Sequence, residues 1–144
     1  MASVFDVAKY ILHKRGRMST WKLQKLCYYS QAWQLAWTDH ELFPEDFEAW
    51  RNGPVCRALF YEHHGKFSVE ENDIPHGNVD ALTDDERETV DIVLEGYGDR
   101  EPYELREQTH FEPPWKNARN GLPEEAPCET VITKDSMIGY YGSL

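Results

Sequence analysis

The sequence STWKLQKLCYYSQAWQLAW occupies residues 19–37 and predicts one long helix. Ser19 is a good N-cap, because its side-chain oxygen can accept a hydrogen bond from a free N–H group of the first turn. Apolar side chains cover most of the circumference of this helix, whereas a surface helix carries a single apolar stripe. At about 1.5 Å per residue it would be about 30 Å long, the width of a small domain. We therefore expect it to be buried at the centre of the fold.

Several other segments are predicted to be helical. Residues 3–14 form an amphipathic helix that ends before Gly16, and Thr83-Asp84-Asp85-Glu86 is a capping box that begins another. Shorter helices are expected from Pro54, where proline suits the first helical position, from Pro102 and from about Lys134.

Extended structure is predicted only in short pieces. Residues 41–51 break the helical pattern and indicate a small β-hairpin or short extended segments. Residues 66–82 show no periodicity and are expected to form a loop. The fold class is therefore mainly α: a single compact helical domain, residues 1–144, around one central buried helix.

Charge is strongly negative and unevenly distributed. The net charge is −11, and residues 68–112 contain 15 acidic residues and only three arginines. Direct nucleic-acid binding is disfavoured, because phosphates would meet a repelling surface. A basic protein partner would be attracted instead. The alternative is that the acidity only keeps the protein soluble.

An acidic stripe is predicted on the helix that begins after Thr83. Asp84, Glu88, Asp91 and Glu95 follow one another at helical spacing, nearly opposite the apolar face. Like charges at this spacing repel one another. The stripe is either a solvated acidic face or a docking face for a basic partner.

Large aromatic and basic side chains cluster in loops and near the C-terminus. Tryptophan, tyrosine and arginine dominate the hot spots of protein interfaces. Alternatively, these side chains pack loops against the helices, and this structural role is preferred for Trp50 and Trp115. The candidate contact residues are Trp50, Arg51 and Asn52 at an Asn-Gly-Pro turn, His110 and Trp115 beside a double proline, and Tyr140 and Tyr141.

No cofactor or metal site is expected. Cys27, Cys56 and Cys128 form no C-x-x-C motif, and the adjacent His63 and His64 would point apart on a helix. A Cys–His nucleophile pair remains an open alternative, because its members need only meet in space. An odd number of cysteines, with neither a signal peptide nor a long apolar run, favours reduced cytoplasmic thiols and no membrane insertion.

Three separated blocks resemble the Panacea domain. Residues 22–33, KLQKLCYYSQAW, resemble its KLQKLLYYAQAW signature. Residues 42–55, with FEAWRNGPV, resemble its PLF…IEAWKYGPVV segment, and residues 109–116, THFEPPWK, are similar to its T-H-x-x-x-P-W element. The aromatic run at residues 138–141 resembles its C-terminal end more loosely. Arg51-Asn52 replaces the commoner Lys-Tyr at the turn, a difference that points to a changed partner.

The resemblance implies a mainly helical, non-catalytic antitoxin of the SocA- and GepA-like group, found on phages and mobile elements. It would neutralise a cognate toxin with a basic surface by direct binding. Toxins paired with this family include alarmone-synthetase-like enzymes that attack translation and Fic/Doc-type folds. Two alternatives remain open. One is a proteolytic adaptor that delivers a toxin to an ATP-dependent protease, and the other is a small enzyme that uses cysteine or histidine.

Overall fold

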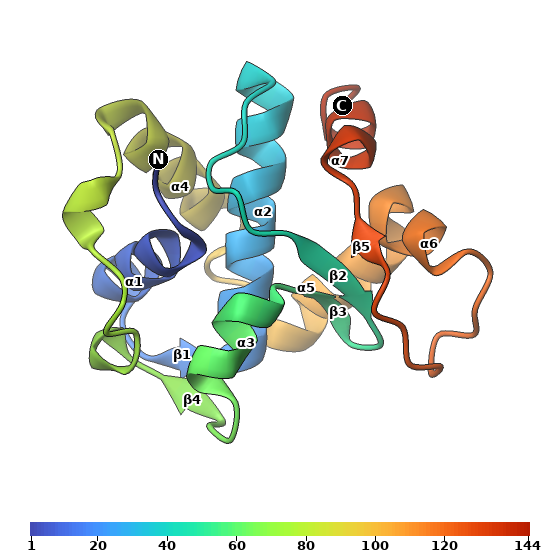
Figure 1. Cartoon of the computed structure of the whole chain (residues 1–144), viewed down its shortest axis with the longest axis horizontal. Coiled ribbons are helices and arrows are strands. Elements are labelled where there is room, and N and C mark those ends of the chain that lie inside the picture. The colour runs from blue at the N-terminus through green and yellow to red at the C-terminus, as the bar shows by residue number, and fades with distance from the viewer.

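A central helix organises the protein (Figure 1). The computed structural model describes residues 1–144, and α2, Thr20–Thr38, passes through its middle. Ser19 is the N-cap, and its side chain accepts a hydrogen bond from the backbone N–H of Lys22. Thirteen of the 19 residues of α2 are buried, on more than one face. The expected central buried helix is therefore confirmed.

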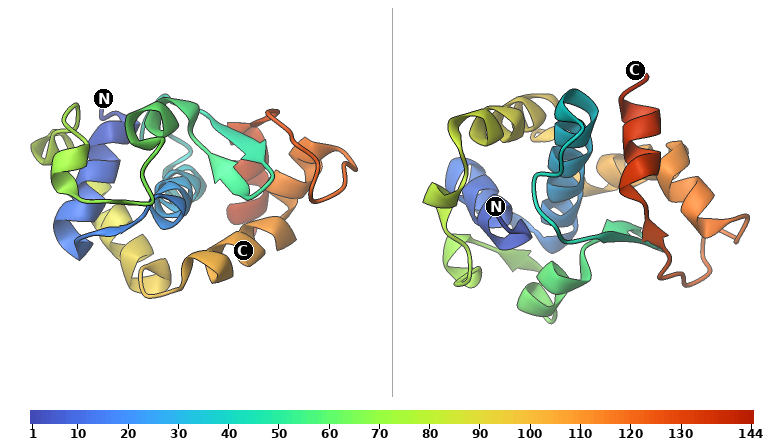
Figure 2. Two further views of the ribbon diagram at one scale, coloured as in Figure 1. Left: turned by 90° about the horizontal axis from the view of Figure 1, so that it is seen from below. Right: turned by 45° about the horizontal axis from the view of Figure 1, so that its top comes forward.

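The remaining helices surround α2, as the view along α2 in the left panel of Figure 2 shows. Helices α1, α4, α5 and α7 all pack directly against it. Side-chain caps begin α1 at Ser3 and α4 at Thr83, and both are capping boxes. The helices around α2 are α1 (Val4–Arg15), α3 (Arg57–His63), α4 (Asp84–Tyr97), α5 (Pro102–Phe111), α6 (Pro113–Arg119) and α7 (Lys134–Tyr141).

Two small antiparallel sheets complete the architecture. In the first, β2 (Phe47–Trp50) pairs with β3 (Gly53–Val55) in a hairpin, and β5 (Val131–Ile132) adds to the other edge of β2. In the second, β1 (Met18–Ser19) pairs with β4 (Ser68–Val69).

The predicted hairpin is confirmed, but its second strand extends beyond residue 51. Pro54, expected to begin a helix, instead lies in β3 opposite Ala49, and α3 begins only at Arg57. The reason is the turn: Gly53 has a φ of +115°, which reverses the chain and lets residues 53–55 pair with β2. Pairing between strands prevails here over the local preference of proline for a helix start.

The segment 66–82 is irregular, as expected, yet it is anchored. It contains β4 and two short 3-10 helices, η1 (Glu71–Asp73) and η2 (Val79–Ala81). Val69 and Ile74 are fully buried, so the segment packs onto the rest of the fold.

One hydrophobic core joins both ends of the chain. A single cluster of 31 buried residues runs from Ala2 to Tyr141, and α2 contributes to its centre. No helix combines the length and the apolarity that crossing a membrane requires.

Candidate partner-binding surfaces

The predicted contact residues lie on opposite sides of α2 (Figures 1 and 2). The acidic residues belong to α4, which packs against α2 and α1. The aromatic residues lie around the β2–β3 hairpin and in helices α5 to α7. The structure therefore does not bring the two sets together, and each is a separate candidate surface.

Two of the four predicted carboxylates on α4 are used within the chain. Asp91 accepts a hydrogen bond from the hydroxyl of Tyr10 at 2.8 Å and lies 4.0 Å from Nζ of Lys14. Burial and this hydrogen bond raise the pKa of Tyr10 to about 12. Asp84 pairs with Arg87 one turn later in α4. Asp91 therefore helps to hold α4 against α1.

The other two carboxylates, Glu88 and Glu95, are exposed and form no ion pair within the chain. Ile92 lies between them on the helix and is 45% exposed. Ile92 therefore offers apolar area for a contact beside the two charges. We define Glu88, Ile92 and Glu95 as the acidic face of α4.

Trp50 and its turn form the rim of the hairpin. The indole of Trp50 is half-buried and packs edge-on against the ring of Phe60, with centroids 5.0 Å apart. Arg51 is exposed at the turn, and Oδ1 of Asn52 accepts a hydrogen bond from Nε of Arg106 at 3.3 Å. Of this group, Arg51 is the side chain most available to a partner.

His110 and Trp115 are buried and stack on each other, with parallel rings 3.8 Å apart. Nε1 of Trp115 donates a hydrogen bond to the backbone oxygen of Trp50 at 2.9 Å, so this pair holds the hairpin against α5 and α6. Nδ1 of His110 lies 2.6 Å from the carboxylate of Glu124, yet burial lowers the pKa of His110. The preferred clamping role fits this geometry.

Tyr141 lies in the core, 1% exposed, and Tyr140 beside it is half-buried. The hydroxyl of Tyr141 donates to Oε1 of Glu112 at 2.7 Å, and Tyr29 donates to the same oxygen at 2.8 Å. Burial raises the pKa of Glu112. The hydroxyl oxygen of Tyr28 is 3.1 Å from that of Tyr141, which extends the buried network. Tyr141 thus ties α7 to α2 and is not on the surface.

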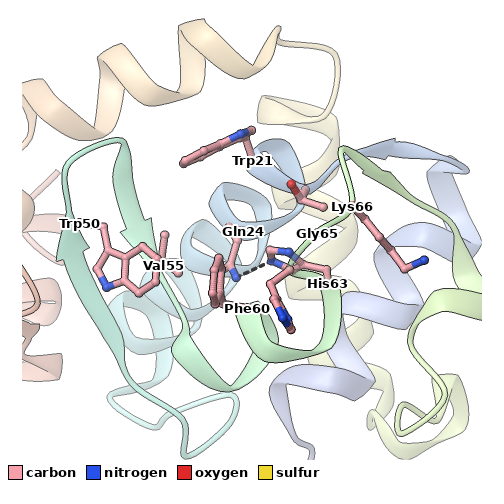
Figure 3. Close-up of a pocket in the computed structure, with 10 residues that line it drawn as sticks. Trp21, Gln24, Trp50, Val55, Phe60, His63, Gly65 and Lys66 are labelled. Carbon is pink, nitrogen blue, oxygen red and sulfur yellow. Dashed lines mark hydrogen bonds between the residues drawn. The ribbon is translucent and has the colours of Figure 1, made fainter.

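The sequence analysis missed Trp21, an exposed side chain in the first turn of α2. It lines a hollow of about 140 Å³ together with Trp50 and Phe60. Figure 3 shows its indole projecting from α2 on one side, with Trp50 and Phe60 on the other. At the base, Nε2 of Gln24 lies 2.9 Å from Nε2 of His63, and burial lowers the pKa of this histidine.

Trp21 also borders two neighbouring hollows, of about 300 and 350 Å³. The first contains Lys25, four residues further along α2. Residues four apart on a helix project from the same side, and this spacing is the signal that could have identified the pair. Neither residue was among the predicted contact residues.

The three cysteines and the possible metal ligands are the remaining candidate reactive groups. No group of three or more histidine, cysteine, aspartate or glutamate side chains is placed to hold a metal ion. Cys27 and Cys56 are buried, and burial raises the pKa of both thiols, which disfavours the nucleophilic thiolate. Cys128 is partly exposed and lines the hollow of about 350 Å³ that Trp21 also borders.

Comparison with protein families assigns the chain. Residues 23–116, well over half of its length, match the family described as antitoxin SocA-like, Panacea domain. The protein belongs to this family, which supports a general antitoxin role. The matched segment contains α4, the hairpin and most of α2, whereas Trp21 and α7 lie outside it. Neither the curated proteins nor the solved structures include a match.

Proposed function

We propose that this protein is a cytoplasmic antitoxin that neutralises a cognate toxin by binding it directly through the acidic face of α4. The observation that carries the proposal is the pair of unpaired, exposed carboxylates, Glu88 and Glu95, on either side of the exposed Ile92. Family membership supports the antitoxin role, and this face supplies both charge and an apolar centre for the contact.

The sign of the charge indicates the partner. The acidic residues of α4 and the net charge of −11 attract a basic surface at long range. An enzyme that acts on tRNA or on nucleotide phosphates has a basic cleft, because it must bind phosphates. The acidic face could occupy such a cleft. A toxin of the alarmone-synthetase-like or Fic/Doc type would fit.

The proposal is tested by charge reversal at the two free carboxylates. The double variant E88K/E95K leaves Asp91 in place, because Asp91 holds Tyr10 and its loss would confuse folding with binding. In a growth assay with the co-expressed toxin, we expect loss of protection. With purified proteins, we expect toxin affinity to fall about tenfold or more, and its dependence on salt to flatten.

The matched control is E125K/D135K, which makes the same change in charge at two exposed acids outside α4 that form no ion pair. It should protect cells as the wild type does, and circular dichroism should show both double variants folded. Protection by E88K/E95K equal to that of the wild type would remove the acidic face from the proposal.

The same assay separates neutralisation by binding from delivery to a protease. An antitoxin that only covers its toxin protects cells that lack ATP-dependent proteases, whereas an adaptor does not. Protection that disappears in such cells would identify the protein as a proteolytic adaptor.

A further inference from the structure

Lys25 is buried without a partner. Its side chain is 1% exposed, and Nζ has no hydrogen-bond acceptor within the chain. Buried charged groups are normally paired, because taking an ion out of water costs roughly several kcal/mol per ion unless another group compensates. A lysine in this state either loses its proton or is stabilised by an acceptor from outside the chain.

The fold makes room for this lysine. A Cβ atom at Gly53 would lie 2.5 Å from Cε of Lys25, so the glycine of the hairpin turn provides the space for the lysine stem. The ring of Trp21 covers the other side, with its centroid 5.0 Å from Nζ. Trp21 is itself 41% exposed, so its ring separates Nζ from solvent.

The hollow beside Lys25 is suited to an anion. None of the six residues that line its volume of about 300 Å³ is acidic, in a protein whose net charge is −11. The first turns of α2 and α5 both border it, although Ser19 already caps α2 and Glu101 and Glu104 form a capping box at the start of α5, so the cations of the hollow carry the argument. The lining residues are Trp21, Lys25, Asn52, Pro102, Tyr103 and Arg106.

Arg106 provides the second cation of the hollow. Its Nη1 is paired with Glu107 at 2.7 Å, and its Nη2 lies 3.8 Å from Glu124. Both glutamates lie outside the lining of the hollow. Two carboxylates therefore flank Arg106, but its Nη2 donates no hydrogen bond within the chain and is free to donate to a ligand.

We propose that this hollow binds a small ligand through an oxyanionic group, a carboxylate or a phosphate, that accepts hydrogen bonds from Lys25 and Arg106. Charge-assisted hydrogen bonds from two cations are the usual way to hold such a group. The exposed rings of Trp21 and Tyr103 form apolar walls for the rest of the ligand. The site is distinct from the acidic face of α4 and has the opposite charge.

The test uses two probes, inorganic pyrophosphate for the phosphate source and succinate for the carboxylate source, at constant ionic strength. Binding to the full chain is followed by tryptophan fluorescence and by the ¹³Cε resonance of Lys25, which reports its protonation. K25M removes the ammonium and keeps the length of the side chain. The control K22M makes the same change on the same helix, outside the hollow.

We expect at least one probe to bind the wild type and K22M equally, to shift the Lys25 resonance toward the protonated form, and to bind K25M at least tenfold more weakly. Preference for pyrophosphate would assign a phosphate ligand, preference for succinate a carboxylate ligand, and either result supports the site. If neither probe binds, or if K25M binds as the wild type does, the proposal is wrong. R106Q tests the second cation separately, because this variant should weaken probe binding while Lys25 remains in place.

Discussion

The acidic face of α4 and the hollow beside Lys25 show two opposite ways of placing charge. Glu88 and Glu95 are exposed, so water stabilises them and their presence costs the fold little. Lys25 is enclosed, and within the chain its ammonium has the ring of Trp21 beside it but no hydrogen-bond acceptor to offset its loss of water. The first region can be changed without damage to the fold, whereas the second carries an energetic penalty that a ligand could relieve.

The largest effect is expected from Lys25→Met. Burial, and secondly the charge of Arg106, lower the pKa of Lys25 from 10.5 to about 7. Other titratable groups near the ammonium are His63, whose pKa is lowered by burial and also by the charge of Lys25, and Tyr103, which lines the same hollow. Since the unfolded chain keeps the higher pKa, keeping Lys25 buried at pH 7 costs on the order of 4 kcal/mol. K25M should therefore increase the free energy of unfolding at pH 7 by up to about this cost. Urea denaturation measures the increase.

The sign of the pH dependence follows from proton binding. Between pH 7 and 10.5 the unfolded state holds the Lys25 proton and the folded state does not, so wild-type stability attributable to this residue rises with pH. Below pH 7 both states are protonated, and this contribution no longer changes. K25M should lack the rise and K22M should keep it. Parallel pH curves for the wild type and K25M would show that Lys25 is not desolvated.

A smaller loss of stability is expected from Gly53→Ala. The φ of +115° is unfavourable for a residue with a side chain, and the added Cβ meets Cε of Lys25. Together these should reduce the free energy of unfolding by about 1–3 kcal/mol. In the K25A background the larger part of the steric clash should disappear, leaving the backbone part and a tight contact with Oγ1 of Thr109 at 3.1 Å. An identical loss in both backgrounds would mean that Gly53 does not provide space for the lysine.

On α4, the comparison can be sharpened within one helix. Asp91→Ala removes the hydrogen bond to the buried Tyr10 and should cost about 1–2 kcal/mol of unfolding free energy. Thermal unfolding followed by circular dichroism measures this, with Glu88→Ala as the matched variant one turn earlier. A comparable loss from both variants would contradict the division of α4 into structural and free carboxylates.

The smallest effect on stability is expected from E88Q/E95Q. Removing two exposed like charges should change the free energy of unfolding by less than about 0.5 kcal/mol, and any change should be stabilising. The salt dependence of toxin binding should nevertheless decrease. A loss of stability above this value would show that these carboxylates have a structural role.

The candidate site was only partly predictable, for reasons that particular residues show. The acidic stripe could be located from helical spacing, but its division into bonded Asp91 and free Glu88 depends on Tyr10, which is 81 residues away in sequence. Trp115 and Tyr141 could be recognised as prominent aromatics. Their burial depends on partners from β2 and α2, which local sequence does not reveal.

The amino-acid sequence by itself determined the central helix, the capped start of α4 and the presence of a hairpin, because periodicity, capping and turn chemistry act over a few residues. Only the tertiary structure decided that Pro54 joins a strand, that the acidic face and the aromatic cluster lie apart, and that Lys25 is enclosed between Gly53 and Trp21. These outcomes depend on which segments, distant in sequence, contact one another in the folded protein. Desolvation and strand pairing are properties of that shared environment and not of any short stretch of chain.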